Sequence, residues 1–129
     1  TLKKNMKLQT KIFNYNYDFK VMKKLISKSQ FIISLKHHPL IFSLGESVPA
    51  ISICYDDYYL RKNTGAMKNF GLGEFVLSKS NVNIQNIENL IHKIISKKKI
   101  IKGMNIYLRL YKKKQKNFFI NFLKKISFF

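Results

Sequence analysis

Apolar residues in the first third of the chain recur at helical spacing. Met22, Leu25 and Ile26 share one face of a helix, and the lysines between and around them face outward. Asp18 precedes this stripe and is a suitable N-cap, because its carboxylate can accept a hydrogen bond from a free backbone N–H. The pattern therefore predicts a helix over residues 19–29.

Three strand-like runs follow, and a helical segment separates each run from the next. The runs are short, apolar and rich in β-branched or aromatic residues, and they cover residues 31–35, 48–54 and 75–77. The helical segments between and after them cover residues 39–45, 58–70 and 83–96. Such an alternation is typical of parallel strands joined by helices. The sequence therefore predicts an α/β fold, a Rossmann-like parallel sheet with flanking helices, in which the first run is buried on both faces.

A basic and aromatic segment follows this α/β pattern. It is helix-prone, and it combines the lysines at 112–114 with the phenylalanines between residues 117 and 129. We therefore expect three parts: an N-terminal lead-in at residues 1–18 with a short strand over 11–15, an α/β unit at residues 19–98, and a basic amphipathic helical tail at residues 99–129.

Charge is distributed unevenly along the chain, whose 25 Lys and Arg against 6 Asp and Glu give a formal net charge of +19. Residues 1–28 hold eight lysines and one acid, residues 29–88 hold five basic residues and five acids, and residues 89–129 hold twelve basic residues and no acid. Basic ends favour anionic partners such as acidic lipid, nucleic acid or polyanionic saccharide. The alternative is that the basic ends bind no anionic partner and only reflect a composition rich in Lys, Asn and Ile. No nucleic-acid recognition signature is present, so no specific nucleic-acid partner is expected.

The single cysteine and the lengths of the apolar runs bear on the compartment. Cys54 lies inside a strand-like run, where cysteine mostly acts as a small apolar residue, and one cysteine allows no internal disulfide. No uninterrupted apolar stretch approaches the roughly 18 residues that a membrane-spanning helix needs. We expect a cytoplasmic protein, whose aromatic basic tail suits peripheral contact with the anionic inner face of the membrane. The tail can instead pack on another domain with its lysines solvated.

Polar residues whose side chains can bind an anion or exchange a proton follow the first strand-like run. Lys36, His37 and His38 precede Pro39, which suits the first turn of a helix, so all three are expected in the connecting loop. There they would lie beside free backbone N–H groups that favour an anion. Lysine supplies charge, and histidine exchanges a proton near neutral pH. The alternative is that both histidines are ordinary polar surface residues.

A second polar group follows the next strand-like run. Asp56 and Asp57 could hold a metal ion, but capping of the following helix is the preferred interpretation, and no metal is expected. Arg61 and Lys62 lie on the first turns of that helix, where one of them could point into a crevice or both could be solvated. Because the carboxyl ends of parallel strands meet at one edge of a sheet, this group is expected near the first.

Taken in order, these residues resemble the C-terminal half of the polysaccharide pyruvyl transferase family, over about residues 19–96. Lys36 replaces the family's arginine, which weakens bidentate recognition of an acid group to a point charge. Extra residues at 58–61 also depart from the family pattern. The matching pieces are Lys36-His37-His38 in place of Arg-x-His, the helix Leu40–Gly45, the strand Val48–Ile53, Tyr55-Asp56 at its end, Lys62 and Gly65 at the family spacing, and Phe70-Gly71-Leu72.

The resemblance implies a function and a set of roles. Enzymes of this family transfer a pyruvyl group from phosphoenolpyruvate to a sugar hydroxyl in cell-surface polysaccharide biosynthesis, and they resemble two-domain glycosyltransferases of the B type. On this basis His38 is the catalytic residue, as acid or base or by contacting the phosphate, Lys36 and Lys62 bind the donor, and His37 is a spacer. The expected partners are phosphoenolpyruvate and a saccharide acceptor, free or lipid-linked, and no cofactor is expected.

The same resemblance implies that the chain is the C-terminal domain of a B-type fold and supplies one wall of a cleft, so that it is inactive alone.

Two other functions compete with this interpretation. One is a basic, non-catalytic module that binds membrane or nucleic acid. The other is part of a B-type glycosyltransferase that uses a nucleotide-sugar donor, because fold alone does not determine function.

Overall fold

The chain folds around a small parallel sheet. The computed structural model describes residues 11, 18–96 and 98–126. Three strands pair in parallel in the order β1-β2-β3, namely β1 (Ile32–Ser34), β2 (Ala50–Cys54) and β3 (Val76–Ser78). The helices are α1 (Phe19–Ser27), α2 (His37–Gly45), α3 (Asp57–Lys68), the 3-10 helix η2 (Gly73–Phe75), α4 (Ile84–Ser96) and α5 (Lys98–Ile126). The predicted α/β class with a parallel sheet and flanking helices is confirmed.

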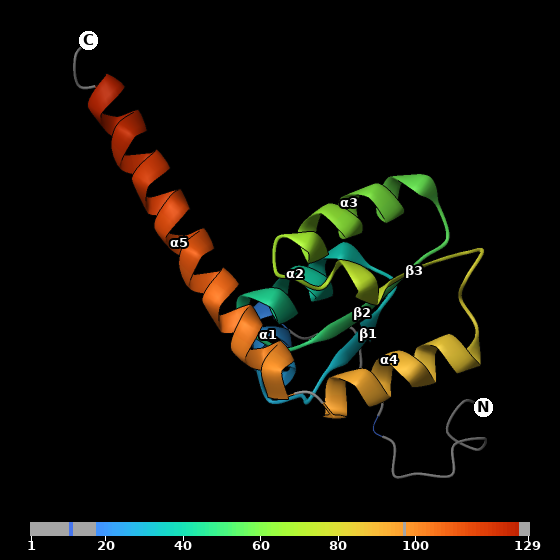
Figure 1. Ribbon diagram of the computed structural model, residues 1–129. Helices are drawn as coiled ribbons and strands as arrows, with labels where there is room; N and C mark the ends of the chain where they lie inside the picture. The colour runs from blue at the N-terminus through green and yellow to red at the C-terminus, as the bar shows by residue number, and fades with distance from the viewer. Residues whose placement is uncertain (1–10, 12–17, 97, 127–129) are drawn as a thin grey trace.

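The helices form layers on the two sides of the sheet. Helices α2 and α3 lie side by side on one side, and α4 lies on the other, as Figure 1 shows. Strand β2 is central, and all five of its residues are buried. Each large apolar side chain removed from water here contributes about 1.5–3 kcal/mol. The core gathers Leu40, Leu44, Ile51, Met67, Phe75, Leu77, Ile94 and Met104.

Strand β1 differs from the prediction of a strand buried on both faces. It pairs with β2 on one side, and within the described residues it forms an edge of the sheet. Ile33 is 43% exposed and the following Leu35 is 53% exposed. Burial on both faces is therefore wrong for this run, because an apolar composition does not reveal whether a strand lies at the centre or the edge of a sheet.

Helix α2 begins two residues earlier than predicted. His37 and His38 form its first turn, and Lys36 is the N-cap residue in an extended conformation, so the placement of both histidines in a loop is wrong. Pro39 is the third residue of the helix. The first four N–H groups of a helix have no acceptor within the helix, so proline at this position costs no hydrogen bond and permits the earlier start.

Side-chain caps fix several other helix ends. Asp18 Oδ1 accepts a hydrogen bond from the Lys20 N–H at 3.3 Å, as predicted. The N-cap of α3 is Asp56, whose Oδ1 accepts from the Tyr59 N–H at 2.8 Å. Asn83 accepts from the Asn86 N–H at 2.8 Å at the start of α4. These caps stabilise each helix by about 0.5–2 kcal/mol and use two of the six acids.

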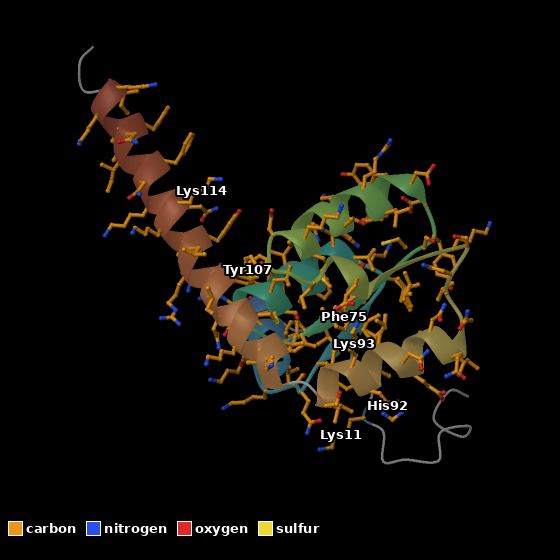
Figure 2. The ribbon with its side chains drawn as sticks, in the orientation of Figure 1. Lys11, Phe75, His92, Lys93, Tyr107 and Lys114 are labelled. Atoms are coloured by element: carbon orange, nitrogen blue, oxygen red, sulfur yellow. The ribbon has the colours of Figure 1, made fainter. Side chains whose placement is uncertain are left out.

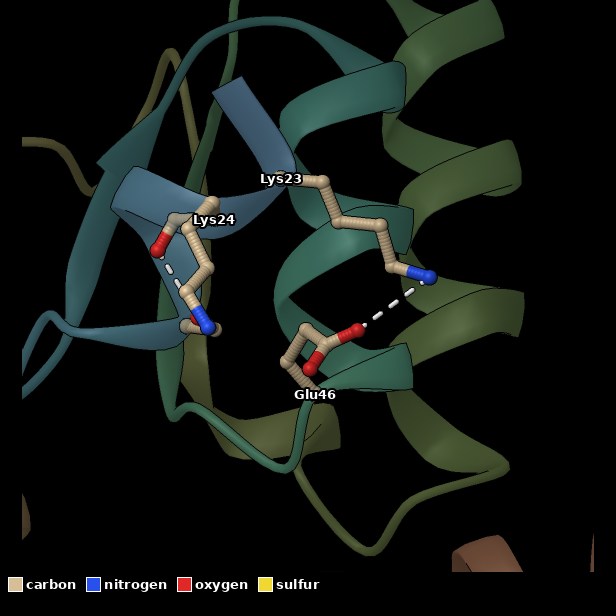
Figure 3. A network of polar contacts seen from close by, with 4 residues as sticks. Lys23, Lys24 and Glu46 are labelled. Carbon is tan, nitrogen blue, oxygen red and sulfur yellow. Dashed lines mark hydrogen bonds and ion pairs between the residues drawn. The ribbon is translucent and has the colours of Figure 1, made fainter. Parts of the chain in front are cut away.

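An ion pair joins α1 to the end of α2. Lys23 Nζ lies 3.1 Å from Glu46 Oε1, and Figure 3 shows this pair beside the hydrogen bond that Ser27 Oγ donates to the Lys24 carbonyl. Both charged side chains remain partly exposed, so the pair contributes at most about 1 kcal/mol. The rest of the predicted lead-in, at residues 1–10 and 12–17, lies outside the described residues, and so does most of its predicted strand.

The predicted basic tail is one long helix whose first half packs on the α/β unit. Met104 is fully buried, and Leu108 packs against the core. Tyr107 lies over Gly71, a region visible in Figure 2. Gly71 has φ of 73°, and its N–H donates to the Lys68 carbonyl at 3.1 Å, so it terminates α3 in the left-handed conformation that glycine favours.

Replacing Gly71 tests how α5 is attached to the α/β unit. A Cβ at this position would lie 2.8 Å from Cε2 of Tyr107 and would also be strained by the positive φ. We expect Gly71→Ala to lower the free energy of unfolding by about 1–3 kcal/mol in urea titrations. Gly103→Ala is the matched control, because that glycine lies inside α5 and a Cβ added there would meet no atom within 4 Å, so it should gain up to about 1 kcal/mol. Equal stability of the two variants would contradict the close approach of Tyr107.

Candidate functional site

The carboxyl ends of the three strands meet at one edge of the sheet. The strands end at Ser34, Cys54 and Ser78, and because they are parallel the segments that follow them begin on the same side. Helix α2 starts just after β1, and helix α3 starts just after β2. Open α/β sheets bind ligands at this edge.

A buried hydrogen-bond network lies beneath this edge and is centred on Asn63. The Asn63 side chain is fully buried on the inner face of α3. Its Nδ2 donates to Ser52 Oγ at 2.9 Å and lies 3.6 Å from Cys54 Sγ, while its Oδ1 lies 2.7 Å from His37 Nδ1. One amide therefore links the start of α2, the middle of α3 and the end of β2.

One orientation of the Asn63 amide goes with one tautomer of His37. With the amide nitrogen facing Ser52, the oxygen faces His37, and a carbonyl oxygen can only accept. In this orientation the proton of a neutral His37 ring resides on Nδ1. Its Nε2, on the other side of the ring, is then left with a lone pair that can bind a proton or a donor group.

The network leaves no buried polar atom unpaired. Within the described residues, every buried side-chain nitrogen or oxygen atom has a hydrogen-bond partner. Satisfied buried networks order a site, whereas an orphaned group costs about 1–3 kcal/mol. The His37 ring, itself half-buried, is thus positioned by the interior of the fold.

The two lysines predicted to bind a donor lie at opposite ends of a pair of tyrosines. Lys36 Nζ lies 5.7 Å from the centroid of the Tyr59 ring, and Lys62 Nζ lies 5.4 Å from that of Tyr58. The two tyrosine rings pack edge to face with centroids 5.4 Å apart. Lys62 Nζ also donates to the Tyr58 hydroxyl at 3.4 Å. A row of two cations and two aromatic rings therefore runs from the start of α2 along the first turns of α3.

The backbone beside Lys36 is held by the last residue of β1. The Lys36 N–H donates to Ser34 Oγ at 3.1 Å, and the Ser34 hydroxyl donates to the Lys36 carbonyl at 2.8 Å. These two bonds turn the chain between β1 and α2, so Lys36 leaves the sheet edge in a defined direction.

His38, the predicted catalytic residue, is exposed on the first turn of α2. Its ring packs edge to face with that of His37, with centroids 6.3 Å apart. The structure thus brings His38 and Lys36 to the start of α2, and Lys62 lies on α3 at the far end of the tyrosine pair. Arg61, the other basic residue considered on this helix beside Lys62, is also exposed on α3.

The acids at the end of β2 serve the fold. Asp56 caps α3, and Asp57 lies exposed in its first turn, where the helix dipole favours a negative charge. In the part of the chain that the structure describes, no three His, Cys, Asp or Glu side chains gather as a metal site.

Sequence reasoning missed Asn63, Ser52 and the tyrosine pair. One signal for Asn63 was available, because it lies four residues before Met67 and so shares the buried face of α3. A polar amide at such a position must find partners inside the fold. Which partners it finds depends on the packing of α2 and β2, which the spacing does not reveal.

Two hollows of the surface lie elsewhere, beside α5. A groove of about 900 Å³ is lined by residues of α5 together with Asn69, and a smaller one of about 260 Å³ lies between α5, α2 and α3. Neither groove includes Lys36, His37 or Lys62 among its lining residues. The candidate site therefore lies outside both grooves.

Comparisons of the chain with protein-family models, with curated proteins and with solved structures give no match. The resemblance to pyruvyl transferases therefore stays a prediction, and functional inference rests on the residues at the sheet edge. None of the helices in the described ranges combines the length and the apolar character needed to cross a membrane.

The cost of removing Asn63 tests the buried network. Asn63→Ala leaves the His37 Nδ1–H and the Ser52 hydroxyl without their partner, so we expect a loss of about 1–3 kcal/mol in the free energy of unfolding. Urea unfolding followed by circular dichroism measures it. Asn105→Ala, at an exposed position of α5, is the control and should change stability by no more than about 0.5 kcal/mol. A loss at Asn63 no larger than at Asn105 would contradict the network.

Proposed function

We propose that this chain contributes one wall of a pyruvyl transferase site, in which a pyruvyl group passes from phosphoenolpyruvate to a saccharide. The observation that carries the proposal is the row formed by Lys36, Tyr59, Tyr58 and Lys62 beside the start of α2. Phosphoenolpyruvate carries a phosphate and a carboxylate, and each lysine of the row would bind one of these anions. Lysine binds each as a point charge.

The chemistry asks for a proton-exchanging group beside these cations. Ketal formation joins two sugar oxygens to the central carbon of the donor and breaks the bond from that carbon to the phosphate oxygen. Of the two hydroxyl protons released, one goes to the methylene carbon and the other leaves with phosphate. Lys36 and Lys62 would stabilise the charge that collects on the leaving phosphate and on the carboxylate. The resemblance assigns the proton transfer to His38.

The proposal extends to the fold and the setting of the reaction. We take the three-stranded parallel sheet as part of the C-terminal domain of a B-type glycosyltransferase fold, with the second wall of the cleft supplied by another domain. A nucleotide-sugar donor is the closest competitor, because its diphosphate needs the same cations. The proposed reaction takes place in the cytoplasm, on a free or lipid-linked acceptor.

Titration of the ¹⁵N-labelled chain with phosphoenolpyruvate tests the donor site. We expect the amide signals of residues 36–38 to shift on binding, and Lys36→Met and Lys62→Met each to weaken binding about tenfold, which corresponds to about 1.4 kcal/mol. Lys20→Met, an exposed lysine of α1, is the matched control and should bind as the unmodified chain does. Shifts with a nucleotide-sugar but none with phosphoenolpyruvate would favour the glycosyltransferase and overturn the pyruvyl donor.

A specific feature of α5 favours a second function, binding to an anionic membrane surface. The half of α5 from Lys112 to Ile126 extends beyond the α/β unit, as Figure 1 shows, and contains no acid. Phe118 is 73% exposed, and Phe119 and Phe122 are also largely exposed. Lysines beside them, such as Lys114 in Figure 2, complement acidic lipid headgroups. Pairing of this half with a second copy would bring lysines together.

Vesicle co-sedimentation tests the membrane function. We expect the chain to bind anionic vesicles at low salt and neutral vesicles weakly, and Phe118→Ser with Phe122→Ser to reduce binding at least about tenfold, since each buried Phe contributes about 1.5–3 kcal/mol. Ile101→Ser with Ile106→Ser, exposed positions on the packed half of α5, is the control. Unchanged binding by the phenylalanine variant, or preferential binding of RNA, would contradict membrane insertion.

A further inference from the structure

His37 and His38 are neighbours, yet the fold treats them differently. The His37 Nδ1–H is bonded to the fully buried Asn63 at 2.7 Å, whereas the His38 side chain is exposed. A histidine that exchanges a proton during a reaction needs a fixed ring orientation and a single tautomer, because the proton is transferred only over a narrow range of donor–acceptor distances. His37 has both.

The partner of His37 suits both protonation states of its ring. The Asn63 oxygen accepts from Nδ1–H when the ring is neutral, and it continues to accept when Nε2 gains a proton. The amide is itself held by a hydrogen bond of 2.9 Å to the buried Ser52 hydroxyl. His37 Nε2 can therefore take up and release a proton while the ring stays in place.

One of the cations is the neighbour of His37 in the chain. Lys36 is the N-cap residue of α2 and His37 is its first residue. The Lys36 ammonium group lies 5.7 Å from the centroid of the Tyr59 ring on α3, the helix that also carries Asn63. The same two helices position the charge and the proton-exchanging ring.

We propose that His37, and not His38, is the catalytic histidine of this site, and that Asn63 is its positioning residue. This inference rests on the proposed pyruvyl transfer. His37 Nε2 accepts the proton of the attacking sugar hydroxyl and delivers it to the methylene carbon of phosphoenolpyruvate. The π electrons of the double bond form the new C–H bond, and an electron pair of the hydroxyl oxygen forms the new bond to the central carbon. The second sugar hydroxyl then replaces phosphate on that carbon, its proton leaves with the phosphate, and Nδ1 of His37 keeps its proton throughout.

Carbethoxylation by diethyl pyrocarbonate tests the inference, because the reagent modifies an imidazole nitrogen that carries a lone pair. The chain has three histidines, and His92 on α4 is exposed and serves as the internal control. With the rate at each histidine followed by peptide mass spectrometry, we expect saturating phosphoenolpyruvate to slow modification of His37 at least about tenfold and to leave His92 unchanged. Protection of His38 alone would overturn the inference and leave the proposed function standing. Protection of neither would overturn the proposed function.

Two substitutions of Asn63 separate positioning from folding. Asn63→Asp keeps an oxygen acceptor for the His37 Nδ1–H, so protection by phosphoenolpyruvate should persist. Asn63→Leu has a similar size but no acceptor, so the ring is released and protection of His37 should fall to less than about threefold, while the circular dichroism spectrum stays that of a folded chain. Full protection in Asn63→Leu would show that Asn63 does not position the ring. If Asn63→Leu does not fold, Asn63→Asp still tests the role of the acceptor. Loss of His37 protection in Asn63→Asp would overturn that role, because this variant keeps the acceptor oxygen.

Discussion

The side-chain amide of Asn63 is the interaction on which the rest of the candidate site depends. It is fully buried between α3, the start of α2 and the end of β2, and a buried amide is costly unless its oxygen and its nitrogen both find partners. His37 and Ser52 supply those partners from two different elements. The pairing therefore fixes how α2 and α3 lie relative to each other at the carboxyl edge of the sheet.

Several features of the edge follow from that arrangement. Because α2 starts beside α3, Lys36 at its N-cap reaches the Tyr59 ring, and the packing of Tyr59 on Tyr58 extends the contact to Lys62. In the described part of the chain, the ion pairs involve neither of these lysines, and Asp56 caps α3. The edge consequently carries two exposed lysines and one half-buried imidazole held from the interior, and the proposed anionic donor would bind there.

Much of the fold could be predicted from the sequence because it depends on local patterns. The helical stripe at Met22, Leu25 and Ile26 and the caps at Asp18 and Asn83 are properties of short segments, and the structure has helices with these caps there. The position of β1 at an edge could not be predicted, because apolar composition is the same in central and edge strands. The start of α2 was misplaced because Pro39 is compatible with several first-turn positions.

The candidate site was less predictable than the fold, for a physical reason. The sequence identified Lys36, His37, His38 and Lys62 as polar residues after strands, but it gave no basis for preferring one histidine, and the family resemblance favoured His38. The difference between the two rings arises from a bond to Asn63, which is 26 positions away in the chain. Contacts of that kind are set by packing, and periodicity carries no information about them.

The central claim is that the interior of the fold holds His37 in one tautomer. Long-range ¹H–¹⁵N correlation spectra of the three imidazole rings measure it directly. The account predicts that His37, at a pH where its ring is neutral, shows a single tautomer protonated at Nδ1, with a proton that exchanges slowly with water, while His38 and His92 show averaged rings with fast exchange. A His37 ring that averages like the other two, or one protonated at Nε2, would contradict it.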